Sequence, residues 1–158
     1  MKQLLPFFGL LVAMILFAAW LTRGGLQFQL QSKNTMKVGD TTLTVEIADT
    51  PEKHEKGLAG RDSLGESEGM LFVMTADTAP SFWMRDMKFP LDILWINNGK
   101  VAEITENVPV PSPGSSLDTL TRFVPSQPID YVLEVNAGWA RVHNITVGTP
   151  VELPAAIK

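Results

Sequence analysis

Apolar residues beyond position 41 occur in short runs bounded by turn residues, and this pattern limits the fold more than any other feature of the chain. Residues 42–47 alternate between polar and apolar side chains, whereas residues 69–74 and 91–96 are more continuously apolar. Both patterns predict β-strands. Less regular runs predict further strands at 81–84, 100–104, 119–124, 130–135 and 145–153. Because no long helical patterns alternate with these strands, we expect an all-β domain, either a compact sandwich or a distorted barrel.

The same region contains signals for one or two short helices. Residues 50–52 (Thr-Pro-Glu) are typical of a helix N-terminus, and Gly60 is expected to end this helix near residue 59. Residues 136–142 predict a second helical turn. The Asn-Gly pair at 98–99 predicts a tight hairpin turn, and residues 108–116, which contain three prolines, predict a loop.

A long apolar run precedes the predicted domain. Residues 4–21 carry no charged side chain, and as a helix these eighteen residues would span about 27 Å, close to the roughly 30 Å of a membrane hydrocarbon core. Ala18 and Ala19 are small enough for signal cleavage, but Phe17 and Trp20 fit a cleavage site poorly. We therefore expect an uncleaved anchor, with a cleaved signal peptide as the alternative and a buried helix of a soluble protein as a third reading.

Three segments follow from these patterns. Residues 1–22 are interpreted as a signal anchor or signal peptide, residues 23–35 as a polar tether, and residues 36–158 as a single all-β domain preceded by the apolar helix. Basic residues before the apolar run favour an inside amino terminus. The expected location is the cell membrane, with the domain facing the periplasm or exterior; after signal cleavage the protein would instead be secreted or periplasmic.

Charge and residue types exclude several functions. Residues 35–158 carry 10 basic and 17 acidic side chains, a net charge of −7, which leaves no electrostatic footprint for nucleic acid. The chain has no cysteine, so disulfides, thiol catalysis and cysteine-ligated metals are excluded. The motifs G-x-S-x-G, P-loop and H-E-x-x-H do not occur either. We expect no nucleic acid partner, no cofactor and no metal.

The histidines and methionines have ordinary structural interpretations. His54 lies among charged residues of the first predicted helix and is expected to be solvent-exposed, whereas His143 suits the end of the second helical turn. Four methionines fall between positions 70 and 87. Their neighbours are Leu, Phe and Trp, so core packing is favoured over binding of Cu(I).

Two carboxylates interrupt otherwise apolar strands. Under strand alternation Asp92 points with Leu94 and Ile96, and Glu134 shares a face with Val132. A carboxylate on an apolar face must be paired, hydrogen-bonded or functional. In the structural alternative, Arg side chains or backbone amides satisfy them. In the functional alternative, they belong to a polar pocket with aromatic walls. The candidate ligand-binding residues are Arg61, Trp83, Arg85, Asp92 and Glu134, with Trp95 as a second aromatic wall.

Several motifs resemble the domain of unknown function 192 family, which is uncharacterised and mostly bacterial and archaeal. They are residues 56–64 (KGLAGRDSL), 68–73 (EGMLFV), 81–87 (SFWMRDM), 90–93 (PLDI), 131–135 (YVLEV) and 137–138 (AG). The resemblance covers roughly residues 36–153 and implies a compact, mostly β domain without an assigned reaction. It also implies Asn where this chain has Asp86 and a tendency to Met where it has Ala59.

Three functions remain open from the sequence. The first is a small-molecule or carbohydrate-binding accessory module attached to the membrane through the N-terminal segment. The second is a structural or interaction module without a ligand pocket. The third is a hydrolase in which Asp92 works with Asp86 or Glu134 as acid and base, which requires two carboxylates roughly 5 to 9 Å apart in one cleft.

Overall fold

The computed structural model describes residues 34–74 and 80–157, and the predicted anchor and most of the predicted tether lie outside them. None of the helices in these residues is long and apolar enough to cross a membrane. The described helices are α2 (Pro51–Lys56), α3 (Trp139–Val142) and the 3₁₀ helix η1 (Leu117–Thr119). The strands are β1 (Thr35–Val38), β2 (Thr41–Ala48), β3 (Glu68–Val73), β4 (Leu91–Asn97), β5 (Lys100–Val108), β6 (Tyr131–Asn136) and β7 (Val151–Glu152).

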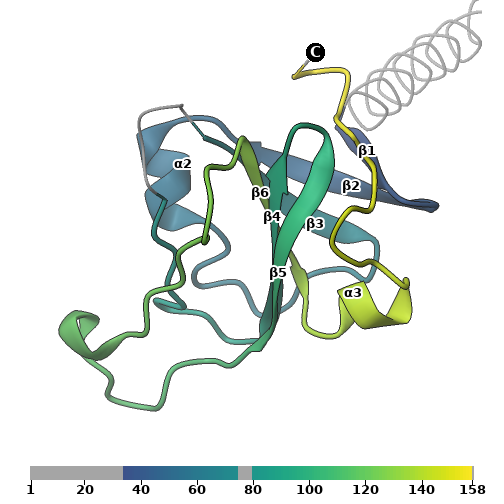
Figure 1. The fold of residues 1–158 in the computed structure, drawn as a ribbon. Coiled ribbons are helices and arrows are strands. Elements are labelled where there is room, and N and C mark those ends of the chain that lie inside the picture. Colours follow the sequence, from purple (N-terminus) through teal and green to yellow (C-terminus); the bar gives the residue numbers. More distant parts are fainter. Residues whose placement is uncertain (1–33, 75–79, 158) are drawn as a thin grey trace, which may run out of the picture. The chain divides into compact units, whose positions relative to one another are not determined.

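These strands form one mixed sheet that curls into a nearly closed barrel (Figure 1). Their order is β5-β4-β6-β3-β2-β1-β7, and β2 and β3, which α2 connects, are the one parallel pair among them. The two ends of the sheet approach each other, because the amide of Val101 donates to the carbonyl of Thr149 at 2.9 Å and the amide of Val151 donates to that of Gly99 at 2.8 Å. Of the two predicted architectures, the structure therefore has the barrel.

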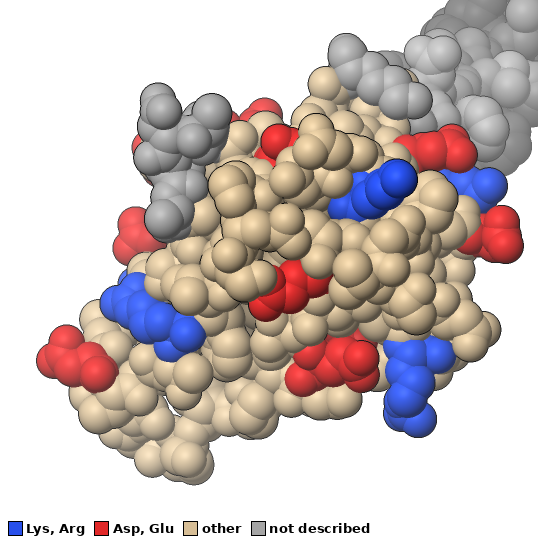
Figure 2. Space-filling model, in the orientation of Figure 1, with Lys and Arg blue, Asp and Glu red and all other residues tan. Residues whose placement is uncertain are grey.

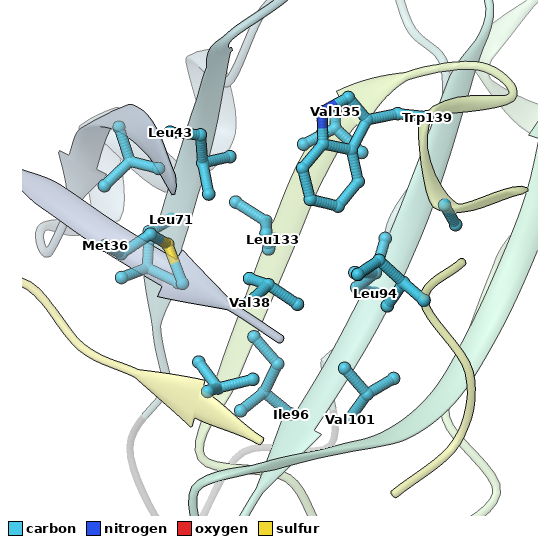
Figure 3. Packing of buried hydrophobic residues seen from close by; sticks show 14 residues of the cluster. Met36, Val38, Leu43, Leu71, Leu94, Ile96, Val101, Leu133, Val135 and Trp139 are labelled. Carbon is cyan, nitrogen blue, oxygen red and sulfur yellow. The ribbon is translucent and has the colours of Figure 1, made fainter. Parts of the chain in front are cut away.

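The inside of the barrel holds one of two hydrophobic clusters (Figure 3). Side chains from several strands meet there, among them Met36, Leu71 and Leu94. The side chain of Trp139, from α3, packs into the same cluster. All four of these residues are at most 5% exposed. This cluster supplies the main core of the domain.

The second cluster lies on the outer face of β3, β4 and β6. It contains Phe72, Ile93, Trp95 and Val132, all buried. Phe82 and Phe123 are half-buried side chains from outside the sheet, and they pack on this cluster. The middle of the sheet is therefore buried on both faces, which explains why β4 reads as a nearly continuous apolar run.

Two predicted strands are not strands in the structure. Segments 81–84 and 119–124 share a single pair of bridging residues, Phe82 and Phe123, and do not join the sheet. Their aromatic side chains cover the outer cluster instead, so their apolar pattern reflects packing rather than sheet pairing. The strand predicted at 145–153 is reduced to Val151–Glu152, and β1 was not predicted.

Both predicted helices are present, and both are shorter than predicted; the second, α3, begins at Trp139 rather than at residue 136, which belongs to β6. The hydroxyl of Thr50 accepts from the amide of Lys53 at 3.3 Å, and Pro51 begins α2. The helix ends at Lys56 rather than near residue 59, because Gly57 adopts a left-handed φ of 48°. The hairpin turn at 98–99 is also confirmed, with positive φ at both residues.

Candidate ligand pocket

A pocket of about 480 Å³ opens beside the outer cluster. It lies between α2 with its flanking turns, the end of β3 and the segment that follows residue 79. The lining residues are 49–51, 54–59, 72–74, 80–83, Arg85, Met87 and Glu134. Its volume is in the range of protein sites that hold small organic ligands.

Aromatic side chains form much of the wall. Phe72 and Phe82 meet edge to face with ring centroids 4.9 Å apart, and the ring of His54 lies 5.8 Å from that of Phe72. Trp95, which was expected to form a wall, lies under Phe82 in the outer cluster instead, with ring centroids 5.6 Å apart. The walls are therefore rigid and mostly apolar.

His54 is the main lining residue that sequence reasoning missed. It is half-buried rather than solvent-exposed, and its Nε2 donates to the carbonyl of Ala48 at 2.9 Å. This bond turns the ring toward β3 and leaves Nδ1 without a hydrogen-bond partner among the described residues. The surrounding charged residues of α2 concealed this orientation, since a helix of six residues presents too few positions for a clear apolar face.

Glu134 contributes a buried carboxyl group to the pocket. It is 6% exposed, and its strand neighbours Met70 and Ile93 are both apolar and buried. Within residues 34–74 and 80–157 its side chain has no hydrogen bond or ion pair. Burial alone raises the pKa of the Glu134 carboxyl to about 8, so the group is mostly protonated at neutral pH.

Arg85 and Trp83 form the rim. The guanidinium of Arg85 lies 3.3 Å from both the backbone carbonyl and the carboxylate of Glu55, which ties this rim to α2. The guanidinium of Arg122 stacks on the Trp83 ring at 4.1 Å from its centroid, and that of Arg85 is 5.8 Å away. A face of the Trp83 ring is thus already covered by a cation.

Asp92 lies on the other face of the sheet, inside the barrel. Because Ile93 pairs with Glu134, those two side chains share a face and Asp92 points the opposite way. Its carboxylate is fully buried and accepts three backbone hydrogen bonds, from Asn107 at 2.9 Å, Gly138 at 3.1 Å and Ala140 at 3.0 Å. Asp92 therefore satisfies amides at the start of α3 and in β5, as the structural alternative predicted.

A β-bulge brings the β5 amide to Asp92. The register between β4 and β5 shifts by one residue between Leu91 and Ile93, and Asn107 at this point has a φ of 53°. A bulge inserts an extra residue and redirects its backbone groups. The amide of Asn107 consequently donates to the Asp92 carboxylate rather than to a backbone carbonyl of the neighbouring strand.

Arg61 and Asp86 lie apart from the pocket. Arg61 forms a two-pronged ion pair with Glu46 on β2, which holds the pKa of the Glu46 carboxyl below its usual range. Asp92 is fully buried inside the barrel, whereas Asp86 is exposed at the surface and Glu134 lies on the other face of the sheet. Neither of them therefore shares a cleft with Asp92. The acid–base pairs proposed for a hydrolase are therefore wrong. Of the five predicted site residues, the structure brings Trp83, Arg85 and Glu134 together and leaves Arg61 and Asp92 elsewhere.

Other possible sites offer less. In the described part of the chain, no group of three or more His, Asp or Glu side chains could hold a metal ion. A second hollow lies between Arg85, Asp86 and the proline-rich loop at 111–117, but the loop residues that line it are exposed. The pocket with Glu134 is thus the better-formed of the two.

Fold and site together define a small barrel-like β domain with one lateral, mostly apolar pocket. The DUF192 family, described as uncharacterized ACR, COG1430, matches residues 33–153, so the chain belongs to this family and the sequence-based assignment is confirmed. The comparison with curated proteins gave no significant match.

Two solved structures are similar to the chain. One is a protein of unknown function from Novosphingobium aromaticivorans, with a TM-score of 0.67 and 30% identity over 75% of this chain and 83% of that one. The other, from Sinorhizobium meliloti, is described as a candidate transcription regulator and has a TM-score of 0.66 and 29% identity over 75% of this chain and 92% of that one.

The two departures from the family pattern have different consequences. Asp86 has a φ of 55°, in the region that Asn tolerates better than most residues, so the Asn implied for relatives suits the backbone there. Ala59 lines the pocket, and a Met at that position would occupy part of its volume.

Proposed function

We propose that this domain is a small-molecule-binding module and that its ligand occupies the pocket beside α2. The observation that carries the proposal is the Glu134 carboxyl group, which is 6% exposed, lines the pocket and has no partner among the described residues. Burying a polar group without a partner costs free energy. A ligand that hydrogen bonds to this group would recover that cost.

The walls favour an apolar ligand over a carbohydrate. Sugars are held by exposed aromatic platforms beside several polar groups, but here Arg122 covers a face of Trp83 and the deeper walls are Phe72, Phe82 and Leu58. The nearby Arg85 is already paired with Glu55. We therefore favour a ligand that is largely apolar and carries few polar groups.

Charge supports a small molecule rather than nucleic acid as the partner. On the face drawn in Figure 2, Lys and Arg side chains are separated by Asp and Glu and form no continuous basic surface. The domain sequence carries a net charge of −7. We also propose that the domain is tethered through its N-terminal segment outside the cytoplasmic membrane.

A thermal-shift screen of the full-length protein against small molecules of neutral, cationic, anionic and sugar classes tests the proposed function. A ligand present at 100 times its Kd stabilises the native state by about 2.7 kcal/mol, which raises Tm by several degrees. Ala59→Met narrows the pocket and should remove or halve the shift. Ala156→Met, the same change at an exposed site outside the pocket, should leave it intact. Failure of every class, or equal shifts in both variants, would overturn the proposal.

A further inference from the structure

We propose, building on the proposed function, that the pocket selects an apolar molecule bearing one neutral amide or carbonyl group, which Glu134 binds as a hydrogen-bond donor. The inference concerns the chemical class of the ligand and the direction of the hydrogen bond. It follows from the surroundings of the carboxyl group and from the cations and anions around the pocket.

The surroundings of Glu134 favour its neutral form. Its neighbours across the sheet, Met70 and Ile93, and its strand neighbour Val132 are all buried and apolar. Neither a basic side chain nor a backbone amide approaches the carboxyl within the described residues. A protonated carboxyl group has one O–H donor and one carbonyl acceptor side by side. An amide on a ligand has the matching acceptor and donor.

A cationic ligand fits the inner wall less well. An ammonium group has three N–H donors, and the side chains beside Glu134 in the sheet, Met70 and Ile93, are apolar and leave unpaired those that the carboxylate does not accept. Burying both charges would cost more than their attraction returns unless each remaining donor finds a partner. Besides Glu134, the two acidic and two basic side chains that line the pocket balance one another, so they supply no net charge that would draw a cation in: Asp49, Glu55, Lys56 and Arg85.

An anionic ligand meets the opposite difficulty. Arg85 is a half-buried cation at the rim, but it is already paired with Glu55. Lys56 is exposed to solvent. Asp49 also lines the pocket and carries the same charge as an anionic ligand. His54 lines it too, but its Nε2 already donates to the backbone carbonyl of Ala48. An anion beside Glu134 would be buried without a counter-ion. A neutral polar group avoids both costs.

Three aromatic probes of nearly equal size test the inference: benzamide, benzylamine and benzoate. The full-length protein is labelled with ¹³C at the methionine methyl groups and held in lipid nanodiscs, so that no detergent competes for the pocket. Met74 and Met87 line the pocket, and Met36 inside the barrel is an internal control. We expect benzamide to shift Met74 and Met87 but not Met36, and to bind at least tenfold more tightly than the other two probes.

The pH dependence reports the direction of the hydrogen bond. With the pKa of Glu134 at about 8, benzamide should bind about tenfold more weakly at pH 9 than at pH 7. Other titratable groups line the pocket, namely Asp49, His54, Glu55, Lys56 and Arg85. Glu134→Gln leaves all of them in place, so the same two measurements on that variant isolate the contribution of Glu134.

Glu134→Gln keeps a donor and an acceptor in the same place but cannot titrate. This variant should bind benzamide within about threefold of wild type and equally at pH 7 and pH 9, whereas Glu134→Leu should lose binding. Tighter binding of benzylamine, stronger at pH 9 and absent in Glu134→Gln, would overturn the inference and leave the proposed function standing. Benzamide binding that is equal at both pH values in the wild type would also overturn it. If no probe shifts Met74 or Met87 at millimolar concentration, both the inference and the proposed function fail.

Discussion

Asp92 and Glu134 are acidic residues on paired strands, both buried, but they meet different partners. Asp92 points into the barrel, where three backbone amides from β5 and the start of α3 surround its carboxylate. Glu134 points outward among Met70, Ile93 and Val132, which offer no donor. The first side chain is satisfied by the fold itself, and the second remains open toward the pocket. This contrast indicates a structural role for Asp92 and supports the binding role that we propose for Glu134.

The stability of the domain should fall as pH rises, through Glu134. Its pKa is about 8 in the folded state against 4.5 in an exposed glutamate, so the folded state binds more protons than the unfolded state between these values. Stability from this group is fully present below pH 4.5, declines as pH rises and is lost above pH 8, a total of roughly 4–5 kcal/mol. Glu134→Gln should remove this dependence.

Urea denaturation of the wild type and of Glu134→Gln at pH 4.5, 6.5 and 8.5 measures the effect. Between pH 4.5 and pH 8.5 the wild type should lose roughly 4 kcal/mol of unfolding free energy relative to the variant, and most of this loss should fall between the two pKa values. Other carboxylates, such as Glu46 beside Arg61, have lowered pKa values and act in the opposite direction, but they cancel in the difference between the two proteins. A difference that stays constant with pH would mean that Glu134 is ionised in the folded state.

At the scale of elements, Asp92 connects β4 to β5 and α3. The short helix α3 has only four residues and no side-chain N-cap of its own, since Gly138 occupies the cap position. The Asp92 carboxylate accepts from the amides of Gly138 and Ala140 and thereby replaces the missing cap. Trp139 is then held against the interior core.

Replacing Asp92 should therefore destabilise the domain severely. Asp92→Asn replaces one of the two accepting oxygens with an amide NH2 group that faces a backbone donor, and should cost about 2–4 kcal/mol. Asp92→Ala leaves three buried amides without an acceptor and should cost at least about 3 kcal/mol. Asp62→Asn is a suitable control, because Asp62 is exposed, pairs only with Lys88 at 2.7 Å and should change stability by less than about 0.5 kcal/mol. If Asp92→Asn unfolds in urea at the same midpoint as Asp62→Asn, the structural role of Asp92 is wrong.

The elements that local patterns specify were predictable. β2, β3, β4 and β6 coincide with predicted runs to within one residue at each end, because alternation and continuous apolar runs are local properties. The parallel pairing of β2 with β3 was not predictable, since register depends on contacts distant in sequence. Segments 81–84 and 119–124 were mistaken for strands because an apolar run that covers a sheet has the same composition as one that joins it.

The candidate site was predictable in part for the same reason. Strand alternation identified the faces of Asp92 and Glu134 but could not place the amides of α3 next to Asp92, 46 residues away in sequence. Arg61 and Arg85 are both basic residues near apolar motifs, and only the three-dimensional arrangement directs Arg85 to the rim and Arg61 to Glu46. His54 was missed because its helix is short and highly charged.

At the scale of the whole molecule, the pocket matters only in the compartment where its ligand occurs. Residues 4–21, which lie outside the described residues, carry no charged side chain, and basic residues at positions 2 and 23 flank them. We expect the full-length protein, expressed in a bacterial host with a C-terminal epitope tag, to remain with the membrane fraction. The tag should be digested by protease added to intact spheroplasts, because the basic residue before the apolar run predicts a domain that faces outward.

Substitutions within this run separate anchoring from other causes of membrane association. Leu11→Arg together with Val12→Arg places two charges near its centre, each costing about 2.5–3.5 kcal/mol of insertion, and should release the protein from the membrane or block its export. Leu117→Arg adds a charge at an exposed position of the domain, 57% exposed, and should leave retention unchanged. Mass spectrometry of the purified chain distinguishes a protein that keeps the anchor at residues 1–22 from a product cleaved near Ala19. A tag protected in intact spheroplasts would place the domain, and the ligand of its pocket, in the cytoplasm.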